Sequence, residues 1–178
     1  MNYNTSGALR KILSQKLTEE DLFEITFHTQ GIEDTPAKRA LYNLLFDEDK
    51  RVSDNAAWVF THFDLYSNMW LYPRQHELMD EAMRTSSSTK RRLLLTLLLR
   101  QPFSTTDILT DFLNFCLKHM LLTSEPTAIR VLCMKLAYEQ CKLFPDLLAE
   151  FREELEIMEP DLLPAALKTA RRNLLKKL

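Results

Sequence analysis

The sequence predicts an all-α protein, an α-α superhelix in which antiparallel helix pairs stack into a solenoid. Composition is the first observation behind this prediction. The chain has 33 Leu against 6 Ile and 3 Val, so straight-chain helix formers outnumber the β-branched residues that strands prefer. The second observation is that helix-start signals recur every 35 or 36 residues, which is typical of a helical repeat. Since a two-helix unit cannot bury its apolar side alone, neighbouring units are expected to stack.

Each expected helix starts at a Ser, Thr or Pro that precedes a leucine-rich segment. Hydroxyl oxygens at these positions cap free backbone N–H groups, and proline suits the first helical turn. We expect residues 1–17 to form an N-terminal cap and residues 160–178 a closing helix of one domain that spans 1–178. First helices of the repeat units are expected to start near Thr18, Ser53, Ser88 and Ser124. Second helices are expected to start near Thr35, Pro73, Thr105 and Pro145.

Composition also excludes several classes of function. The two glycines, Gly7 and Gly31, are isolated, so no glycine-rich loop is available to bind a phosphate group. The longest apolar run, residues 93–99, is far shorter than the ~20 residues of a membrane span. The N-terminus lacks the basic start and apolar core of a secretory signal. These observations predict a cytoplasmic protein without membrane association.

The candidate metal and catalytic residues are few. Cys116 and His119 are three residues apart and share a helix face, and Cys133 and Cys141 follow in the next unit. However, no Cys-x-x-Cys motif occurs, and all three cysteines lie in apolar segments, where a thiol usually packs as a small hydrophobe. No nucleophile stands beside a histidine and an acid at local spacing. We therefore predict no metal, no cofactor, no catalytic residue and no enzymatic activity.

One segment carries a family resemblance. Residues 49–60, Asp-Lys-Arg-Val-Ser-Asp-Asn-Ala-Ala-Trp-Val-Phe, combine an aspartate, a basic-aliphatic pair, small residues and a bulky core residue. This pattern resembles the first helix of a repeat in the HEAT/ARM-type helical-repeat family. Residues 126–130 and the basic end, 168–177, are similar to those of short bacterial HEAT-like chains. The resemblance covers most of the chain and implies a scaffold that binds other proteins.

Some of those bacterial chains carry the name adenylosuccinate lyase. Enzymes of that superfamily resemble one another around a Gly-Ser-Ser-x-Met-Pro-x-Lys loop. The nearest segment here, Ser-Ser-Ser-Thr-Lys at residues 86–90, lacks the glycine and the Met-Pro pair. The sequence therefore does not predict this activity, and it favours a polar loop between helices at that place.

Charge separates the two sets of helices. The later first helices carry a formal charge of +9, and the second helices from residue 73 onward carry −7. The HEAT resemblance implies that second helices line the concave side, so we expect an acidic groove that binds a protein or peptide and whose charge suits a basic one. Such a groove suits neither a DNA duplex nor the activity of HEAT-like DNA glycosylases. The predicted partner-binding residues are Asp80, Glu81, Asp107, Asp111, Glu150, Glu153 and Glu154.

Two alternatives remain open at this point. Aromatic residues between the helices that start at Ser53 and Pro73 either pack on the core or form an exposed docking patch of Tyr66, Trp70 and Tyr72. Trp58 is expected in the core. The alternative function is nucleic-acid binding through the basic first helices and the basic C-terminal tail, with phosphate contacts from Lys90, Arg91, Arg92, Arg171 and Arg172. The oligomeric state is not predicted.

Overall fold

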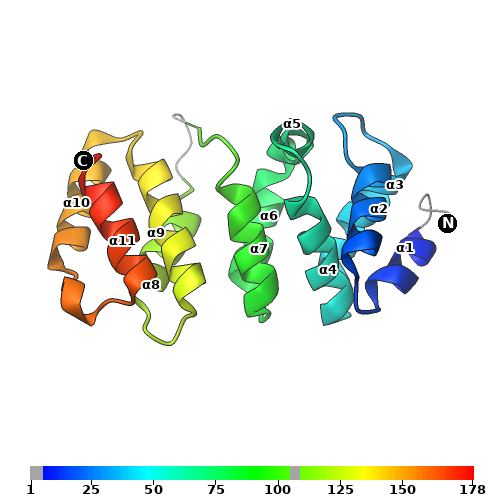
Figure 1. The fold of residues 1–178 in the computed structure, drawn as a ribbon. Helices are drawn as coiled ribbons and strands as arrows, with labels where there is room; N and C mark the ends of the chain where they lie inside the picture. Colours follow the sequence, from blue (N-terminus) through cyan, green and yellow to red (C-terminus); the bar gives the residue numbers. More distant parts are fainter. Residues whose placement is uncertain (1–5, 105–108) are drawn as a thin grey trace. The chain divides into compact units, whose positions relative to one another are not determined.

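The computed structural model describes residues 6–104 and 109–178, and in these ranges the chain forms helices and turns without any strand (Figure 1). The predicted all-α class is confirmed. The chain divides into two compact units: unit 1 is Met1–Gln101 and unit 2 is Pro102–Leu178. The grouping of the helices into repeat units of one domain stays a prediction.

Unit 1 holds the first seven α-helices. They are α1 (Ser6–Leu13), α2 (Glu19–Thr29), α3 (Pro36–Asn43), α4 (Lys50–Thr61), α5 (Leu65–Asn68), α6 (Gln75–Arg84) and α7 (Ser88–Leu98), with the 3-10 turns η1 (Leu44–Phe46) and η2 (Met69–Arg74). The helix α4 packs against α1, α2 and α7, and α6 packs against α7. Fully buried side chains such as Ile25, Leu41, Phe60 and Leu94 form the core between these helices.

Unit 2 is built around one long helix. Its elements are α8 (Thr110–Leu121), α9 (Thr127–Cys141), α10 (Pro145–Ile157), the 3-10 turn η3 (Pro160–Leu162) and α11 (Ala165–Leu175). The helix α9 packs against α8, α10 and α11 (Figure 1). Buried Phe112, Cys116, Met134 and Phe151 fill the space between them. This packing leaves the outer side of α10 in contact with solvent.

Local chemistry sets several helix starts. The Thr18 hydroxyl accepts a hydrogen bond from the Asp21 N–H at 3.1 Å, and the Asp21 carboxylate accepts one from the Thr18 N–H at 2.9 Å, which completes a capping box. Thr35 caps α3 in the same way by accepting from the Lys38 N–H at 3.2 Å. Pro145 is the first residue of α10. These three starts lie where the sequence places them.

Ser53 and Ser88 do not cap their helices, although α7 begins at Ser88 as predicted. Ser53 is buried inside α4, because the Asp49 carboxylate caps the helix one turn earlier by accepting from the Arg51 N–H at 2.9 Å. Ser88 is the first residue of α7, and the cap is its neighbour Ser87. Thr105 lies outside the described residues.

Prolines account for the remaining differences. Pro73 lies inside η2, and α6 begins two residues later. Ser124 precedes α9, which begins directly after Pro126. Pro160 starts only the 3-10 turn η3, and α11 begins directly after Pro164. Because proline favours the first turn of a helix and disfavours its interior, the last proline before each apolar segment determines where the helix begins.

The capping box predicts a measurable stability change. Thr18→Ala removes the hydroxyl that caps the Asp21 N–H, so we expect the free energy of unfolding to fall by about 1 kcal/mol. Urea unfolding followed by circular dichroism measures the change. Thr169→Ala, an exposed position on α11, is the matched control and should alter stability by less than about 0.5 kcal/mol. Equal effects of the two substitutions would show that the capping box contributes nothing.

Candidate functional site

The predicted acidic residues are spread over both units. Asp80 and Glu81 lie on α6 in unit 1, and Asp111 lies on α8 in unit 2. Asp107 is outside the described residues. The remaining carboxylates, Glu150, Glu153 and Glu154, lie on α10. All of the described ones are exposed except Glu81, which is buried.

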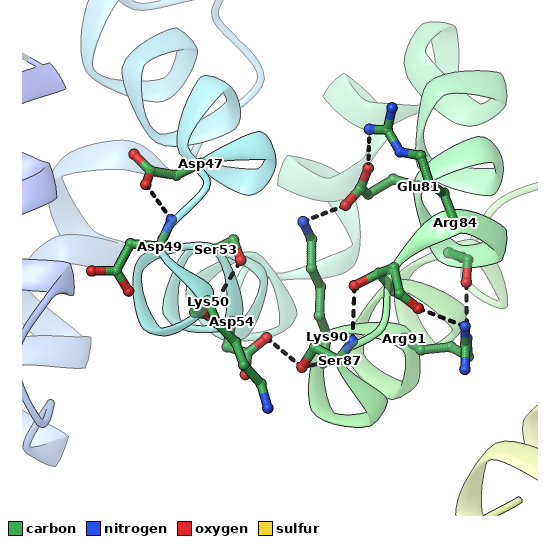
Figure 2. Close-up of polar contacts among 12 residues, drawn as sticks. Asp47, Asp49, Lys50, Ser53, Asp54, Glu81, Arg84, Ser87, Lys90 and Arg91 are labelled. Atoms are coloured by element: carbon green, nitrogen blue, oxygen red, sulfur yellow. Dashed lines mark hydrogen bonds and ion pairs between the residues drawn. The ribbon is translucent and has the colours of Figure 1, made fainter.

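Glu81 belongs to a buried ion pair and not to an open surface. Its Oε1 accepts a hydrogen bond from Lys90 Nζ at 2.5 Å, and its Oε2 accepts one from Arg84 at 2.5 Å (Figure 2). Burial by itself raises the pKa of Glu81, but the hydrogen bonds from Lys90 and Arg84 outweigh it and lower the pKa overall. Lys90 is 3% exposed. The structure therefore corrects two predictions, Glu81 as a partner contact and Lys90 as a phosphate contact.

The neighbours of Lys90 join three helices. Ser87 donates a hydrogen bond to the Asp54 carboxylate on α4 at 2.7 Å, and its hydroxyl accepts from the Lys90 N–H at 3.2 Å (Figure 2). Arg91 donates to the backbone oxygens of Ala82 and Thr85, at 3.0 and 2.6 Å. Since carbonyl groups at the end of α6 engage its guanidinium, Arg91 acts within the fold and does not serve as a free phosphate contact.

Arg171 has a similar position in unit 2. Its guanidinium donates to the backbone oxygens of Leu155 at 2.6 Å and Glu156 at 3.3 Å, near the C-terminal end of α10. Of the five predicted phosphate contacts, only Arg92 and Arg172 are exposed, and they belong to different units. Within neither unit does the structure bring together a basic cluster from these five residues.

The helix α10 carries an acidic face. Glu150, Glu153, Glu154 and Ile157 are spaced i, i+3, i+4 and i+7, which places them on one side of the helix. All four are exposed, and Ile157 is 76% exposed. The turn η3 that follows adds an exposed apolar side chain, Leu162. Carboxylates and the large apolar side chain of Ile157 therefore share one exposed face of α10.

The predicted aromatic patch is mostly part of the core. Trp70 is buried, donates its indole N–H to Asp34 at 3.1 Å, and lies under the Arg74 guanidinium, 3.5 Å from the ring centroid. Tyr72 is half-buried and donates its hydroxyl to the Arg100 carbonyl at 3.4 Å. Tyr66 alone of the predicted three is exposed. Packing of this connection on the core is the alternative that the structure supports.

A groove between α2 and α4 has no counterpart in the sequence analysis. It has a volume of about 430 Å³ and is lined by Glu19, Leu22, Phe23, Thr26, Gln30, Trp58 and His62. Trp58 is half-buried in its wall, which corrects its expected place in the core. Phe23 and Phe27 on α2 are both exposed. Their i, i+4 spacing is the signal that could have found this surface, because it places them beside the buried stripe of the helix and not within it.

The cysteine and histidine residues considered as metal ligands pack within unit 2. Cys116, Cys133 and Cys141 are buried free thiols, and burial raises the pKa of Cys141 to about 11. His119 stacks on Phe115 and places Nδ1 2.8 Å from Glu125 Oε1. A thiol with a raised pKa, such as that of Cys141, stays protonated at neutral pH and is a poor nucleophile. Over residues 6–104 and 109–178, no three His, Cys, Asp or Glu side chains gather as metal ligands would.

Comparisons with known proteins give one match. A family model described as a HEAT repeat domain matches residues 9–178. No curated protein and no solved structure matches the chain. Among the helices that the structure describes, none has both the length and the apolar character to cross a membrane.

Proposed function

The chain belongs to the HEAT repeat domain family, and from this membership we propose that it is a non-catalytic scaffold that binds a protein or peptide partner. The family match confirms the resemblance seen in residues 49–60. HEAT repeats typically mediate protein interactions and are typically non-enzymatic. Stacked helices bury their apolar stripes against one another and leave long faces available for partners.

The acidic face of α10 is the observation that carries the proposed partner class. Glu150, Glu153 and Glu154 form no ion pair within the described part of unit 2 and point to solvent. Such a face attracts a basic segment over a distance of about 8–10 Å at physiological salt. Ile157 and Leu162 beside it offer apolar area that loses water when a partner binds. A basic peptide or basic helix is therefore the proposed partner.

Nucleic acid receives less support as a partner. Lys90 is buried, and Arg91 and Arg171 are engaged by backbone carbonyls. Affinity for nucleic acid depends on several cationic groups that neutralise neighbouring phosphates. Of the five predicted phosphate contacts only Arg92 and Arg172 are exposed, and they lie in separate units. Exposed lysines accompany Arg172 at the C-terminal end, namely Lys168, Lys176 and Lys177, so this end of unit 2 is the surface that would contact phosphates.

Charge reversal on α10 tests the proposal. The variant Glu150→Lys/Glu154→Lys is compared with Glu20→Lys/Glu48→Lys, which makes the same change in net charge at exposed sites in unit 1 that are not predicted partner contacts. Each tagged protein captures partners from the native lysate, with one half of each sample treated with nuclease. We expect a nuclease-resistant partner whose recovery falls at least about tenfold with the α10 variant and stays unchanged with the control.

Two results would contradict this function. Partners that disappear after nuclease treatment would indicate nucleic-acid binding. A protein partner retained equally by the α10 variant, with the same dependence on salt, would show that the acidic face is not the binding surface. Thermal melts of both variants ensure that the comparison concerns folded protein.

A further inference from the structure

We propose that the groove between α2 and α4 docks an amphipathic basic helix of a partner protein, with apolar side chains entering the groove and Lys or Arg side chains facing α2. This inference rests on the proposed protein-binding function and adds a site on unit 1, separate from the acidic face of α10. Three features of the groove support it: its apolar shape, an unpartnered hydroxyl in its lining, and the charge of its surroundings.

The shape of the groove suits protruding apolar side chains. Buried Leu22 and Thr26 line it from α2, while half-buried Trp58 and exposed His62 line it from α4. His62 is held against α4 because its Nδ1 lies 3.0 Å from the Trp58 backbone oxygen, and the two rings meet edge to face. A groove of about 430 Å³ between two helices has room for side chains from successive turns of a third helix.

Two phenylalanines extend this apolar surface. Phe23, on the groove, is 71% exposed, and Phe27 follows one helical turn later at 66%. A partner that covers both Phe side chains removes their apolar area from water, so the two together give it a strong apolar anchor. Exposed aromatic side chains in a row are the residues on which binding energy usually concentrates.

The lining of the groove contains a hydroxyl without a partner. Thr26 is 9% exposed, and its Oγ1 is buried with no hydrogen-bond partner. In contrast, the Thr29 hydroxyl donates to the Ile25 backbone oxygen at 2.6 Å, as threonines inside helices commonly do. A buried hydroxyl without a partner is costly, so a polar group that reaches Thr26 gains a hydrogen bond there.

The negative charge around the groove favours a basic partner. Residues 17–37 contain six Asp and Glu residues and no Lys or Arg. Glu19, one of the six, lines the groove at the first turn of α2, and no lysine or arginine is part of the lining. A helix with basic residues beside its apolar stripe complements this potential, whereas an acidic helix is repelled.

A designed peptide serves as the probe. It is an 18-residue helix of Leu and Lys with all leucines on one face, compared with a scrambled peptide of the same composition and a peptide in which Glu replaces Lys. Tryptophan emission reports on the groove, because Trp58 lines it and the second tryptophan, Trp70, is buried. We expect saturable binding with a blue shift for the amphipathic basic peptide, and at least about tenfold weaker binding of both controls.

Substitutions in the groove test whether the peptide binds there. Phe23→Ser removes an exposed anchor without opening the core, and Glu19→Lys reverses the charge at the rim. We expect Phe23→Ser to weaken the peptide at least about tenfold, and Glu19→Lys to weaken it mainly at low salt. Ile157→Ser and the α10 charge reversal are matched controls in unit 2 that should leave the emission change intact.

Several outcomes would overturn this inference. Binding that is equal for wild type and Phe23→Ser, or binding without any change in tryptophan emission, would show that the peptide docks elsewhere. An apolar dye or indole that binds in a Phe23-dependent way while the peptide does not would assign the groove to a small molecule. Failure of the proposed function is distinguishable, because it is measured on α10 with a cellular partner.

Discussion

Glu81→Ala is expected to lower the free energy of unfolding by about 3–5 kcal/mol, because it leaves the Lys90 ammonium buried without its counter-charge. Lys90 Nζ is 2.5 Å from Glu81 Oε1, and both side chains are more than nine-tenths buried. The loss should appear in urea unfolding followed by circular dichroism. Asp80→Ala, at the exposed neighbouring position on α6, is the control and should change stability by less than about 0.5 kcal/mol.

A second pair of substitutions separates charge from packing. Glu81→Leu/Lys90→Met replaces both charges with apolar groups of similar length, and we expect it to recover most of the stability that Glu81→Ala loses. If Glu81→Ala costs no more than the Asp80→Ala control, the buried pair does not support the packing of α6 on α7.

The same carboxylate gives a pH dependence of known sign. Since the folded-state pKa of Glu81 lies below its ordinary value of 4.5, its contribution to stability is present above that value. The contribution is lost as the pH falls through the lowered, folded-state pKa. We therefore expect the difference in unfolding free energy between wild type and Glu81→Gln to be constant near neutral pH and to shrink in this acidic range.

Lys38→Ala is the second substitution with a large expected effect, a loss of about 3–5 kcal/mol of unfolding free energy. Lys38 has no exposed surface, and its Nζ donates to the backbone oxygens of Gly31 and Glu33, the latter at 2.6 Å. The ammonium also lies 5.4 Å from the centroid of the Trp70 ring. Removing it takes the Lys38 donor from both carbonyls, leaves the Glu33 carbonyl with only the Thr35 N–H at 3.1 Å, and opens a cavity where the side chain was.

Lys38→Met separates the stability lost with the hydrogen bonds from the stability lost with the packed volume of the side chain. Methionine retains most of the volume and cannot donate to the carbonyls, so its stability should fall between wild type and Lys38→Ala. Hydrogen exchange of the loop over residues 30–35 should increase in both variants, because Lys38 joins this loop to α3. Arg39→Ala is the control, because it removes an exposed ion pair with Asp34 and a 3.4 Å hydrogen bond to the Asp34 backbone oxygen but no buried group. A loss below about 1 kcal/mol for Lys38→Ala would contradict the structural role.

Caps and turns follow from residues that are close in sequence. Thr18, Thr35 and Pro145 were predictable helix starts, because a hydroxyl or a pyrrolidine ring acts on backbone groups within about one turn. The predicted helix start at Ser53 was wrong, because Asp49 caps α4 one turn earlier. Only the fold shows which of the two possible caps is used. Gly31 adopts φ of +108°, a conformation that glycine tolerates and that shapes the loop around Lys38.

The candidate sites were harder to predict than the fold. Charge counts indicated an acidic surface, and Glu150, Glu153 and Glu154 are indeed exposed on α10. The same counts included Glu81 and Lys90, nine residues apart on different helices, which neutralise each other inside unit 1. The exposure of Phe23 depends on which helices cover α2.

By itself the sequence determined the all-α class, the helical-repeat family and the local caps, because these depend on composition, period and contacts within a few residues. Only the tertiary structure decided which charges meet solvent, which aromatic rings are covered and where a groove opens between α2 and α4. The physical reason is that burial is a property of neighbours from distant helices. The ammonium group of a lysine such as Lys38 or Lys90 is removed from solvent only when the surrounding helices have packed around it.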